Sequence, residues 1–388
     1  MTTNGAMMHT PSKIPTWPFY EQDEQEAVQQ VLASGRGNYW SGNEGIQFES
    51  EFADWCGTNH GLSVFNGTVA LELALRAVGV VAGDEVIVTP RTFLASAAAI
   101  AAVGAIPIFA DIELSSGNMT VDTIDRVKTS KTRAIVAVHL AGWPVNMPAV
   151  MEFAHANGIR VVEDCAQSHG AEIENTKVGS FGDANAFSFC QDKIMSTGGE
   201  GGMVTTNSDE IRDTVWSLRD HGRNRSKTLS ADHPFGFRWT QDRIGTNARM
   251  TEMQSAIGRR QLLKVDSWVA TRIKNANAIL DGLRDCKEIT LPTPQCSMKH
   301  AFYRLGALTS PAIRDPLIQH LASVGIPVSV GACPEVYREQ AFVNLACGKQ
   351  VDCPKAKELG AKSIAFPVHP GVEKHVDFII EQTKVFFA

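Results

Sequence analysis

The sequence has neither a basic start followed by an apolar core nor an apolar run of the roughly 18–20 residues that span a bilayer. Its most apolar stretch, LASAAAIAAVGAIPIFA, is rich in alanine and is interrupted by Gly104 and Pro107. We therefore expect no signal peptide and no membrane contact, and we interpret this stretch as a buried helix followed by a strand.

The eight cysteines include no C-x-x-C pair, so the sequence predicts neither a structural zinc site nor a disulfide framework, and no metal is expected. Reduced cysteines are typical of a cytoplasmic protein. The net charge of −6 argues against nucleic acid as the main partner, because neutralising phosphates requires clustered Lys and Arg. It still allows a local basic pocket for a small phosphorylated ligand.

The chain has 388 residues, which suits a large domain plus a smaller one. Between residues 60 and 205, apolar strand-like segments such as LSVF, DEVIVTP and IRVVEDCA alternate with helix-like segments such as TVALELALRAVG and MPAVMEFAHANG. This alternation predicts an α/β domain built around a mainly parallel sheet.

The rest of the chain predicts a further division. Residues 206–245 are polar and Arg-rich, and the segment starting TEMQSAIGRRQLL has a long helical periodicity that suits a connection between two domains. We expect an N-terminal arm (1–20), a large α/β domain (21–250), and a linking helix with a small C-terminal α+β domain (251–388).

Three short segments carry residues suited to chemistry. The first is Asn66-Gly67-Thr68, which follows a strand and opens a helix. The start of a helix offers unpaired N–H groups and the positive end of the dipole to a phosphate, and glycine permits close approach. A plain helix cap would explain the same residues.

The second segment is VVEDCAQSHGA, in which Asp164 ends an apolar strand and Gln167 follows three residues later. Ligands of α/β proteins bind at the carboxyl ends of strands. A carboxylate there needs a partner, such as a protonated ring nitrogen, because burying an unpaired charge is costly. A helix-capping aspartate is the simpler alternative.

The third segment is SFCQDKIMSTGGEGG, which places Lys193 between a strand end and a glycine-rich loop. A buried amine can bond to an aldehyde, whereas a solvated loop lysine would need no such setting. Together the three segments offer a phosphate site, a carboxylate for a pyridine nitrogen and a lysine for a Schiff base. These are the groups that hold pyridoxal 5'-phosphate (PLP).

The chain also resembles the DegT/DnrJ/StrS family of sugar-nucleotide aminotransferases, which are fold-type I PLP enzymes. The resemblance covers roughly residues 15–385. It rests on FNGTVALELALRAVGVVAGDEVIVTPRTF, VVEDCAQSHGA, FSFCQDKIMSTGGEGGMV, LRDHGR and GTNARMTEMQSAIGRRQL. It implies a large domain with a mainly parallel sheet and a smaller C-terminal α+β domain.

The resemblance implies a role for each matching residue. Lys193 would form the Schiff base and then carry the proton, and Asp164 would pair with the pyridine nitrogen. Gln167 would lie by the phenolic oxygen, and Phe93 would stack on the ring.

The phosphate would be held by Gly67, Thr68 and Ser188. Asn247 would reach it from a neighbouring subunit, which implies a homodimer with shared active sites.

The implied reaction moves an amino group from L-glutamate, through pyridoxamine 5'-phosphate, to a keto sugar nucleotide. We expect a 4-keto-6-deoxy sugar on UDP or dTDP, used for a surface polysaccharide or glycan; a 3-keto sugar is not excluded. A sugar dehydratase that uses pyridoxamine phosphate is one alternative, but relatives of that kind carry histidine in place of the lysine. A non-catalytic binding or regulatory module is another.

Several positions have two interpretations. Arg91 stands where the family commonly has a small residue and would either face a substrate diphosphate or lie on the surface. Tyr39 and Trp40 would line the sugar site or simply pack. His221 and Arg243 would contact a substrate phosphate or form salt bridges.

Overall fold

The computed structural model describes residues 14–230, 236–294, 297–345 and 352–388. Its centre is a seven-stranded sheet in which only β9 runs antiparallel to its neighbours, so the predicted mainly parallel sheet is confirmed. In spatial order the strands are β1 (His60–Val64), β9 (Gly202–Thr206), β8 (Ala184–Ser188), β5 (Arg160–Asp164), β4 (Thr132–Val138), β2 (Glu85–Val88) and β3 (Ile106–Phe109).

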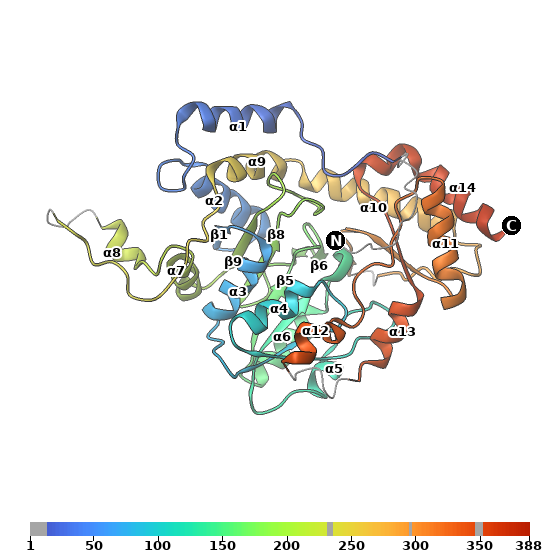
Figure 1. The fold of residues 1–388 in the computed structure, drawn as a ribbon, viewed down its shortest axis with the longest axis horizontal. Coiled ribbons are helices and arrows are strands. Elements are labelled where there is room, and N and C mark those ends of the chain that lie inside the picture. The colour runs from blue at the N-terminus through green and yellow to red at the C-terminus, as the bar shows by residue number, and fades with distance from the viewer. Residues whose placement is uncertain (1–13, 231–235, 295–296, 346–351) are drawn as a thin grey trace.

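Helices connect the strands from β1 to β5 along the chain, and helices cover the sheet (Figure 1). The first of them, α3, starts where Asn66 accepts a hydrogen bond from the N–H of Val69, and it buries one apolar face. The helices of this part are α3 (Gly67–Ala77), α4 (Leu94–Ala102), α5 (Val121–Asp125), α6 (Met147–Ala156) and α7 (Asp209–Leu218). The short α8 (Arg225–Leu229) follows α7 and lies away from the sheet. Because the carboxyl ends of parallel strands meet at one edge, residues that follow β1, β2, β5 and β8 are brought together there.

The periodic segment after residue 250 forms two successive helices, α9 (Glu252–Leu262) and α10 (Val265–Gly282), where the sequence indicated one long linking helix. Two N-terminal helices, α1 (Gln22–Ser34) and α2 (Glu44–Cys56), pack on α9. The ammonium of Lys264, at the break, binds carboxylates at the start of α1, which ties the break to that helix.

The C-terminal part has its own hydrophobic core, which includes side chains of α10 and Ile14. Two antiparallel strands pair there, so an α+β arrangement is present. Its elements are β11 (Leu305–Leu308), α11 (Pro311–Ser323), β12 (Ser363–Phe366), η3 (Pro370–His375) and α14 (Val376–Phe387).

Some residues between 336 and 359 belong instead to the core of the large sheet, although they lie late in the sequence. They are carried by η2 (Val336–Arg338), α12 (Gln340–Asn344) and α13 (Pro354–Lys362). The remaining elements are η1 (Leu140–Gly142), β6 (Glu172–Ile173), β7 (Thr176–Lys177) and β10 (Met298–Lys299). The predicted domain boundaries stay predictions. No helix within the described ranges is long and apolar enough to cross a membrane.

Candidate active site

The start of α3 and the end of β8 approach closely at the carboxyl edge of the sheet. A Cβ atom at Gly67 would lie 2.5 Å from Cβ and 2.9 Å from Oγ of Ser188, so a larger residue would force one element to move. Thr68, in the first turn of α3, is half-buried beside them. Backbone N–H groups and two hydroxyls therefore converge on one small region, as a phosphate requires.

Asp164 is the last residue of β5 and is only 5% exposed. Its Oδ2 accepts a hydrogen bond from the hydroxyl of Ser96 at 2.7 Å, and its Oδ1 accepts one from the N–H of Ala166 at 3.1 Å. In the described part of the chain it pairs with no cationic side chain. A buried carboxylate that has only neutral protein donors suits a protonated ring nitrogen.

Sequence reasoning missed Ser96. It lies inside the alanine-rich run that forms α4, and its hydroxyl lies 2.7 Å from the hydroxyl of Thr92 as well as binding Asp164. The only feature of the sequence that could have identified Ser96 is that it is the one polar residue in LASAAAIAA.

Phe93 lies immediately before α4, and 64% of its surface is exposed. An aromatic ring this exposed at the strand edge is suited to stacking on a ligand ring. Gln167 directs its Oε1 to the N–H of Ala141 at 2.8 Å, which leaves its amide N–H groups to donate elsewhere. Ala141 has a left-handed backbone (φ 57°), so this hydrogen bond helps to hold a strained residue near the site.

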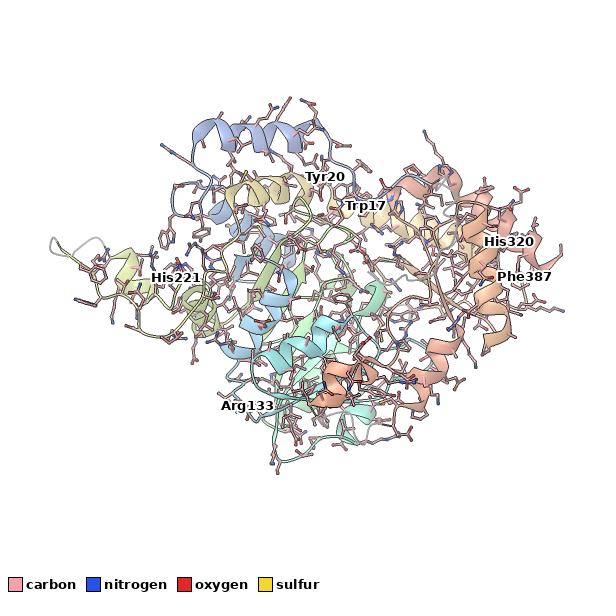
Figure 2. The ribbon with its side chains drawn as sticks, viewed as in Figure 1. Trp17, Tyr20, Arg133, His221, His320 and Phe387 are labelled. Carbon is pink, nitrogen blue, oxygen red and sulfur yellow. The ribbon has the colours of Figure 1, made fainter. Side chains whose placement is uncertain are left out.

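Lys193 lies in the loop between β8 and β9, and its side chain is only 12% exposed. Its backbone carbonyl accepts a hydrogen bond from Nε1 of Trp17 at 2.7 Å; Trp17 is labelled in Figure 2. Its Nζ lies 5.1 Å from the ring centroid of Tyr303 and 3.9 Å from Oδ1 of Asp192. Oδ2 of Asp192 accepts a hydrogen bond from the hydroxyl of Tyr303. The lysine is therefore held among side chains far away in the sequence and is not a freely solvated loop residue.

Asn247 is exposed on a segment that runs beside the end of β1, where the N–H of Phe65 donates to the carbonyl of Ala248 at 2.9 Å. An exposed position is what a contact with a second subunit requires, and that role stays a prediction. His221, labelled in Figure 2, also has a left-handed backbone (φ 59°), and Arg243 is exposed.

Tyr39 and Trp40 form polar contacts with neighbouring side chains. The Tyr39 hydroxyl donates to Oε2 of Glu49 at 3.0 Å and accepts from Nη2 of Arg219 at 2.9 Å. The Trp40 indole donates to Oδ2 of Asp220 at 2.7 Å. Tyr39 is thus buried and Trp40 keeps a partly exposed ring, and both line a cavity of about 470 Å³. Both interpretations given for these residues stay predictions.

Arg91 is not a simple surface residue. Burial lowers the pKa of its guanidinium to about 10, and its Nε is buried without a hydrogen-bond partner in the described part of the chain. It lies against the loop at Gly117, at the β3 side of the sheet.

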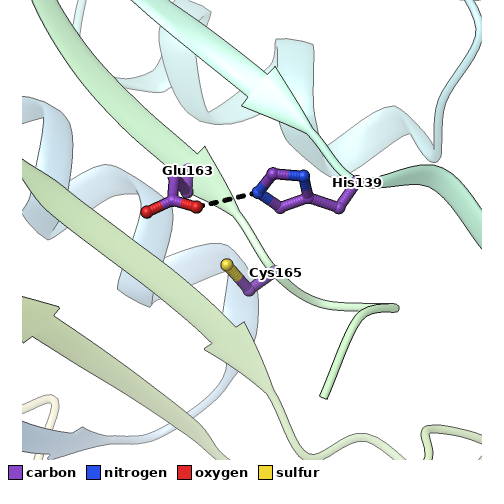
Figure 3. A group of neighbouring side chains, drawn as sticks. All are labelled: His139, Glu163 and Cys165. Atoms are coloured by element: carbon purple, nitrogen blue, oxygen red, sulfur yellow. Dashed lines mark hydrogen bonds and ion pairs between the residues drawn. The ribbon is translucent and has the colours of Figure 1, made fainter. Parts of the chain in front are cut away.

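A buried cluster of His139, Glu163 and Cys165 lies at the end of β5, where Glu163 and Cys165 flank Asp164 in the chain (Figure 3). Nδ1 of His139 accepts from the N–H of Val145 at 3.0 Å, so Nε2 carries the hydrogen and donates to Oε2 of Glu163 at 2.9 Å. Glu163 also accepts from three backbone N–H groups of the segment 179–182. Burial, followed by the charge of Glu163, raises the pKa of the Cys165 thiol. This network anchors the end of β5 directly next to Asp164.

Taken together, these residues suit PLP. The close contact between Gly67 and Ser188 leaves no room for a Cβ, and Asp164 has neutral donors only among the described residues. Phe93 presents an exposed ring, and Lys193 is a sheltered amine. The Gly67–Ser188 contact suits a phosphate, and Asp164 suits a pyridinium nitrogen. Phe93 suits the face of an aromatic ring, and Lys193 suits an aldehyde.

Comparison with known proteins gives the same picture. The model of the DegT/DnrJ/EryC1/StrS aminotransferase family matches residues 18–384. The structure of an aminotransferase from Psychrobacter cryohalolentis superposes with a TM-score of 0.94 and 41% identity, covering 96% of this chain and 98% of that one.

Two curated relatives are named for their sugar substrates. A UDP-N-acetyl-3-dehydro-alpha-D-glucosamine 3-aminotransferase from Acidithiobacillus ferrooxidans is 34% identical over 329 residues, which is 85% of this chain and 84% of the relative. A dTDP-3-amino-3,4,6-trideoxy-alpha-D-glucose transaminase from Streptomyces venezuelae is 33% identical over 378 residues, which is 95% of each.

Proposed function

The chain belongs to the DegT/DnrJ/EryC1/StrS aminotransferase family, and we propose that it moves the amino group of L-glutamate to a keto sugar carried by UDP or dTDP. It is a PLP-dependent sugar-nucleotide aminotransferase. The identity of the amino donor, the nucleotide and the position of the keto group are our proposal and go beyond the family assignment.

The observation that carries this proposal is the setting of Lys193, a sheltered amine in the loop that follows β8, together with the buried carboxylate of Asp164 at the end of β5. PLP, when bound, supplies an electron sink for the transfer of an amino group. We assign Lys193 to its aldehyde and to proton transfer at Nζ, which requires a neutral amine for part of the cycle. The aromatic ring of Tyr303 and the indole of Trp17 position the lysine and limit its contact with water.

The other residues orient the cofactor. We assign the phosphate to Gly67, Thr68 and Ser188, and the face of the ring to Phe93. Asp164 would hold a proton at the pyridine nitrogen, and Ser96 keeps the carboxylate in place. Gln167 would donate to the phenolic oxygen through its amide nitrogen.

The acceptor that we propose is a 4-keto-6-deoxy sugar destined for a surface polysaccharide or glycan. The names of the two curated relatives favour a second candidate, a keto group at C3, since one is named for a 3-dehydro sugar and the other for a 3-amino sugar. A dehydratase is disfavoured because Lys193 is present.

We also propose a homodimer. Phe237, Trp239 and Ile244 are large apolar residues with more than three quarters of their surface exposed, and they precede the exposed Asn247. Exposed apolar side chains close together in the sequence are typical of an interaction surface.

The test follows the cofactor's visible absorbance in the two halves of the reaction. L-glutamate should abolish the visible band of the PLP-loaded enzyme and release 2-oxoglutarate. After the keto acid is removed, UDP- and dTDP-linked 4-keto-6-deoxy and 3-keto sugars are added one at a time, and mass spectrometry identifies any amino sugar. Recovery of the band with 3-keto sugars alone would establish the second candidate, and a band insensitive to glutamate would exclude this donor.

A further inference from the structure

Two arginines are fully buried, each only 1% exposed, but they differ in what surrounds them. Arg219 pairs with Glu49 and donates to Ser63 O at 2.8 Å and to the Tyr39 hydroxyl at 2.9 Å. Burial is the largest single effect and acts to lower its pKa, but the charges and hydrogen bonds of Glu49 and Tyr39 together outweigh burial, and the pKa is raised. Arg219 is thus a fully compensated structural cation.

Arg272, on α10, pairs with no carboxylate among the described residues, although its Cζ lies 5.0 Å from the ring centroid of Trp17. Its Nη1 donates only to the carbonyls of Tyr303 at 3.2 Å and Phe302 at 3.5 Å, and its Nε and Nη2 are buried without a partner in the described chain. Burial, followed by the charge of Arg304, lowers its pKa to about 9. A buried cation without an acid is costly, so the region around it is suited to an anion that is not part of the protein.

Arg304 is the accessible member of this pair. It is half-buried, and within the ranges that the structure describes its guanidinium has no ion pair and no side-chain hydrogen bond. Its Cζ lies 5.5 Å from the ring centroid of Tyr303, and Nζ of Lys193 lies 5.1 Å from the same centroid. The guanidinium and the lysine therefore lie next to the same aromatic ring.

His369 does not supply the missing negative charge. It immediately precedes η3 and is almost fully buried. Its ring stacks on that of Trp17, with 5.9 Å between the two ring centroids. Burial, followed by the charges of Arg272 and Arg304, lowers its pKa to about 3, so it is neutral near pH 7. The charge of Asp192 acts on Arg272, but Asp192 accepts a hydrogen bond from Tyr303 and 52% of its side chain is exposed.

We propose that Arg304 binds a carboxylate of the amino donor, and that Arg272 holds the segment 302–304 in position and adds positive potential there. The proposal rests on the proposed function, in which the donor is an amino acid. A donor carries a carboxylate on the same carbon as its amino group, and therefore brings an anion close to Lys193. The diphosphate of a sugar nucleotide is separated from the reacting keto carbon by the sugar ring, which makes it the less suitable occupant.

The experiment compares Arg304→Gln with Arg284→Gln, an exposed arginine just after α10 that pairs with Asp281. For Arg304→Gln in the PLP-loaded enzyme, we expect kcat/KM for L-glutamate in the first half-reaction to fall roughly 10- to 100-fold, the usual loss for a charge-assisted hydrogen bond. Calorimetry should show that glutarate, a dicarboxylate without an amine, binds wild type and Arg284→Gln but not Arg304→Gln. UDP and dTDP should bind all three alike.

Unchanged glutamate and glutarate behaviour in Arg304→Gln would overturn the proposal. Weakened UDP or dTDP binding with intact glutarate binding would also overturn it, by assigning the arginine to the sugar nucleotide. The melting temperature and visible absorbance of Arg304→Gln must match those of wild type. If they do not, Arg304→Lys is used instead. Lysine keeps the positive charge but cannot form the two parallel hydrogen bonds of a guanidinium, so kcat/KM for glutamate should fall less. If wild type reacts with another amino acid but not with glutamate, the donor assignment fails, and the same comparison with that amino acid still tests Arg304.

Discussion

At the scale of single residues, Lys193 owes its setting to distant parts of the chain. Trp17 binds its carbonyl and Tyr303 covers its ammonium, and these residues lie 176 positions before and 110 positions after it respectively. The groups assigned to the phosphate and the ring nitrogen are separate side chains, so the covalent role and the binding role of the site are separable by mutation.

Lys193→Ala should abolish turnover with glutamate but keep the binding of pyridoxamine 5'-phosphate, because Gly67, Ser188 and Asp164 are untouched. Turnover assays and calorimetry with pyridoxamine 5'-phosphate check the two parts. Lys274→Ala, which removes an exposed lysine on α10, should match wild type in both. Full transamination by Lys193→Ala would contradict the assignment of Lys193 to the cofactor aldehyde and to proton transfer.

Buried histidines should make stability depend on pH. Burial, followed by the charges of Lys193 and Arg272, lowers the pKa of His169 from 6.5 to about 3. As the pH falls below about 6.5, the unfolded chain takes up a proton that the folded chain does not, so the free energy of unfolding decreases. At pH 5 this costs about 2 kcal/mol for one such histidine relative to pH 7.5.

His169→Phe tests this contribution, since the new ring would pack against Phe187 and Phe189 and cannot titrate. Urea unfolding at pH 7.5 and pH 5 should show a smaller loss of stability than in wild type. His155→Gln, at an exposed position, should leave the pH dependence as it is. An unchanged pH dependence in His169→Phe would contradict the lowered pKa.

At the scale of elements, the site depends on how closely α3 approaches β8. The contact between Gly67 and Ser188 leaves no room for a Cβ, whereas the strands themselves are set by their apolar patterns. The same close approach brings the N–H groups at the start of α3 beside the hydroxyl of Ser188. The packing of α3 on β8 and the predicted phosphate site therefore both depend on this contact.

Gly67→Ala should destabilise the protein by about 1–3 kcal/mol through overpacking and should weaken cofactor binding. Adding Ser188→Gly should recover part of the stability, because the nearest clash is with Cβ of Ser188, but not the affinity for the cofactor. Melting temperature and calorimetry separate the two effects. Gly306→Ala, where nothing lies within 4 Å of the added Cβ, is the control; equal losses in the control would contradict the packing argument.

At the scale of the whole molecule, one chain presents most of the proposed site but leaves Asn247 and several large apolar residues exposed. Figure 1 shows α8 lying away from the sheet, beyond α7. A second copy of the chain would cover exposed apolar surface of this part and bring Asn247 to the neighbouring site, as the homodimer proposal requires.

Shared sites predict complementation between two defective subunits. In a heterodimer of Lys193→Ala and Asn247→Ala chains, one of the two sites would combine an intact Lys193 with an intact Asn247. Co-expressed, differently tagged chains should therefore give about a quarter of wild-type activity at random pairing, above either variant alone. Light scattering measures the mass. No gain on mixing, with a dimeric mass, would mean that each site is built from one chain.

How much could be predicted from sequence depends on the range of the interaction. The strands around LSVF and IRVVEDCA and the helix at TVALELALRAVG follow from apolar periodicity, and the segments bearing Lys193 and Asp164 were identifiable from their neighbours in the chain. The break between α9 and α10 was not, because the apolar pattern continues across it while Lys264 is drawn to carboxylates of α1.

The sequence by itself determined the mainly parallel sheet and the family, since these are recorded in local patterns and spaced motifs. The residues assigned to PLP come from the same motifs and stay a prediction. Only the tertiary structure decided that Ser96 supports Asp164 and that Trp17 and Tyr303 enclose Lys193. It also decided that Arg219 has a carboxylate partner, while Arg272 has none among the described residues. The physical reason is that burial and charge compensation depend on which side chains meet in space, and no local pattern in the chain specifies those meetings.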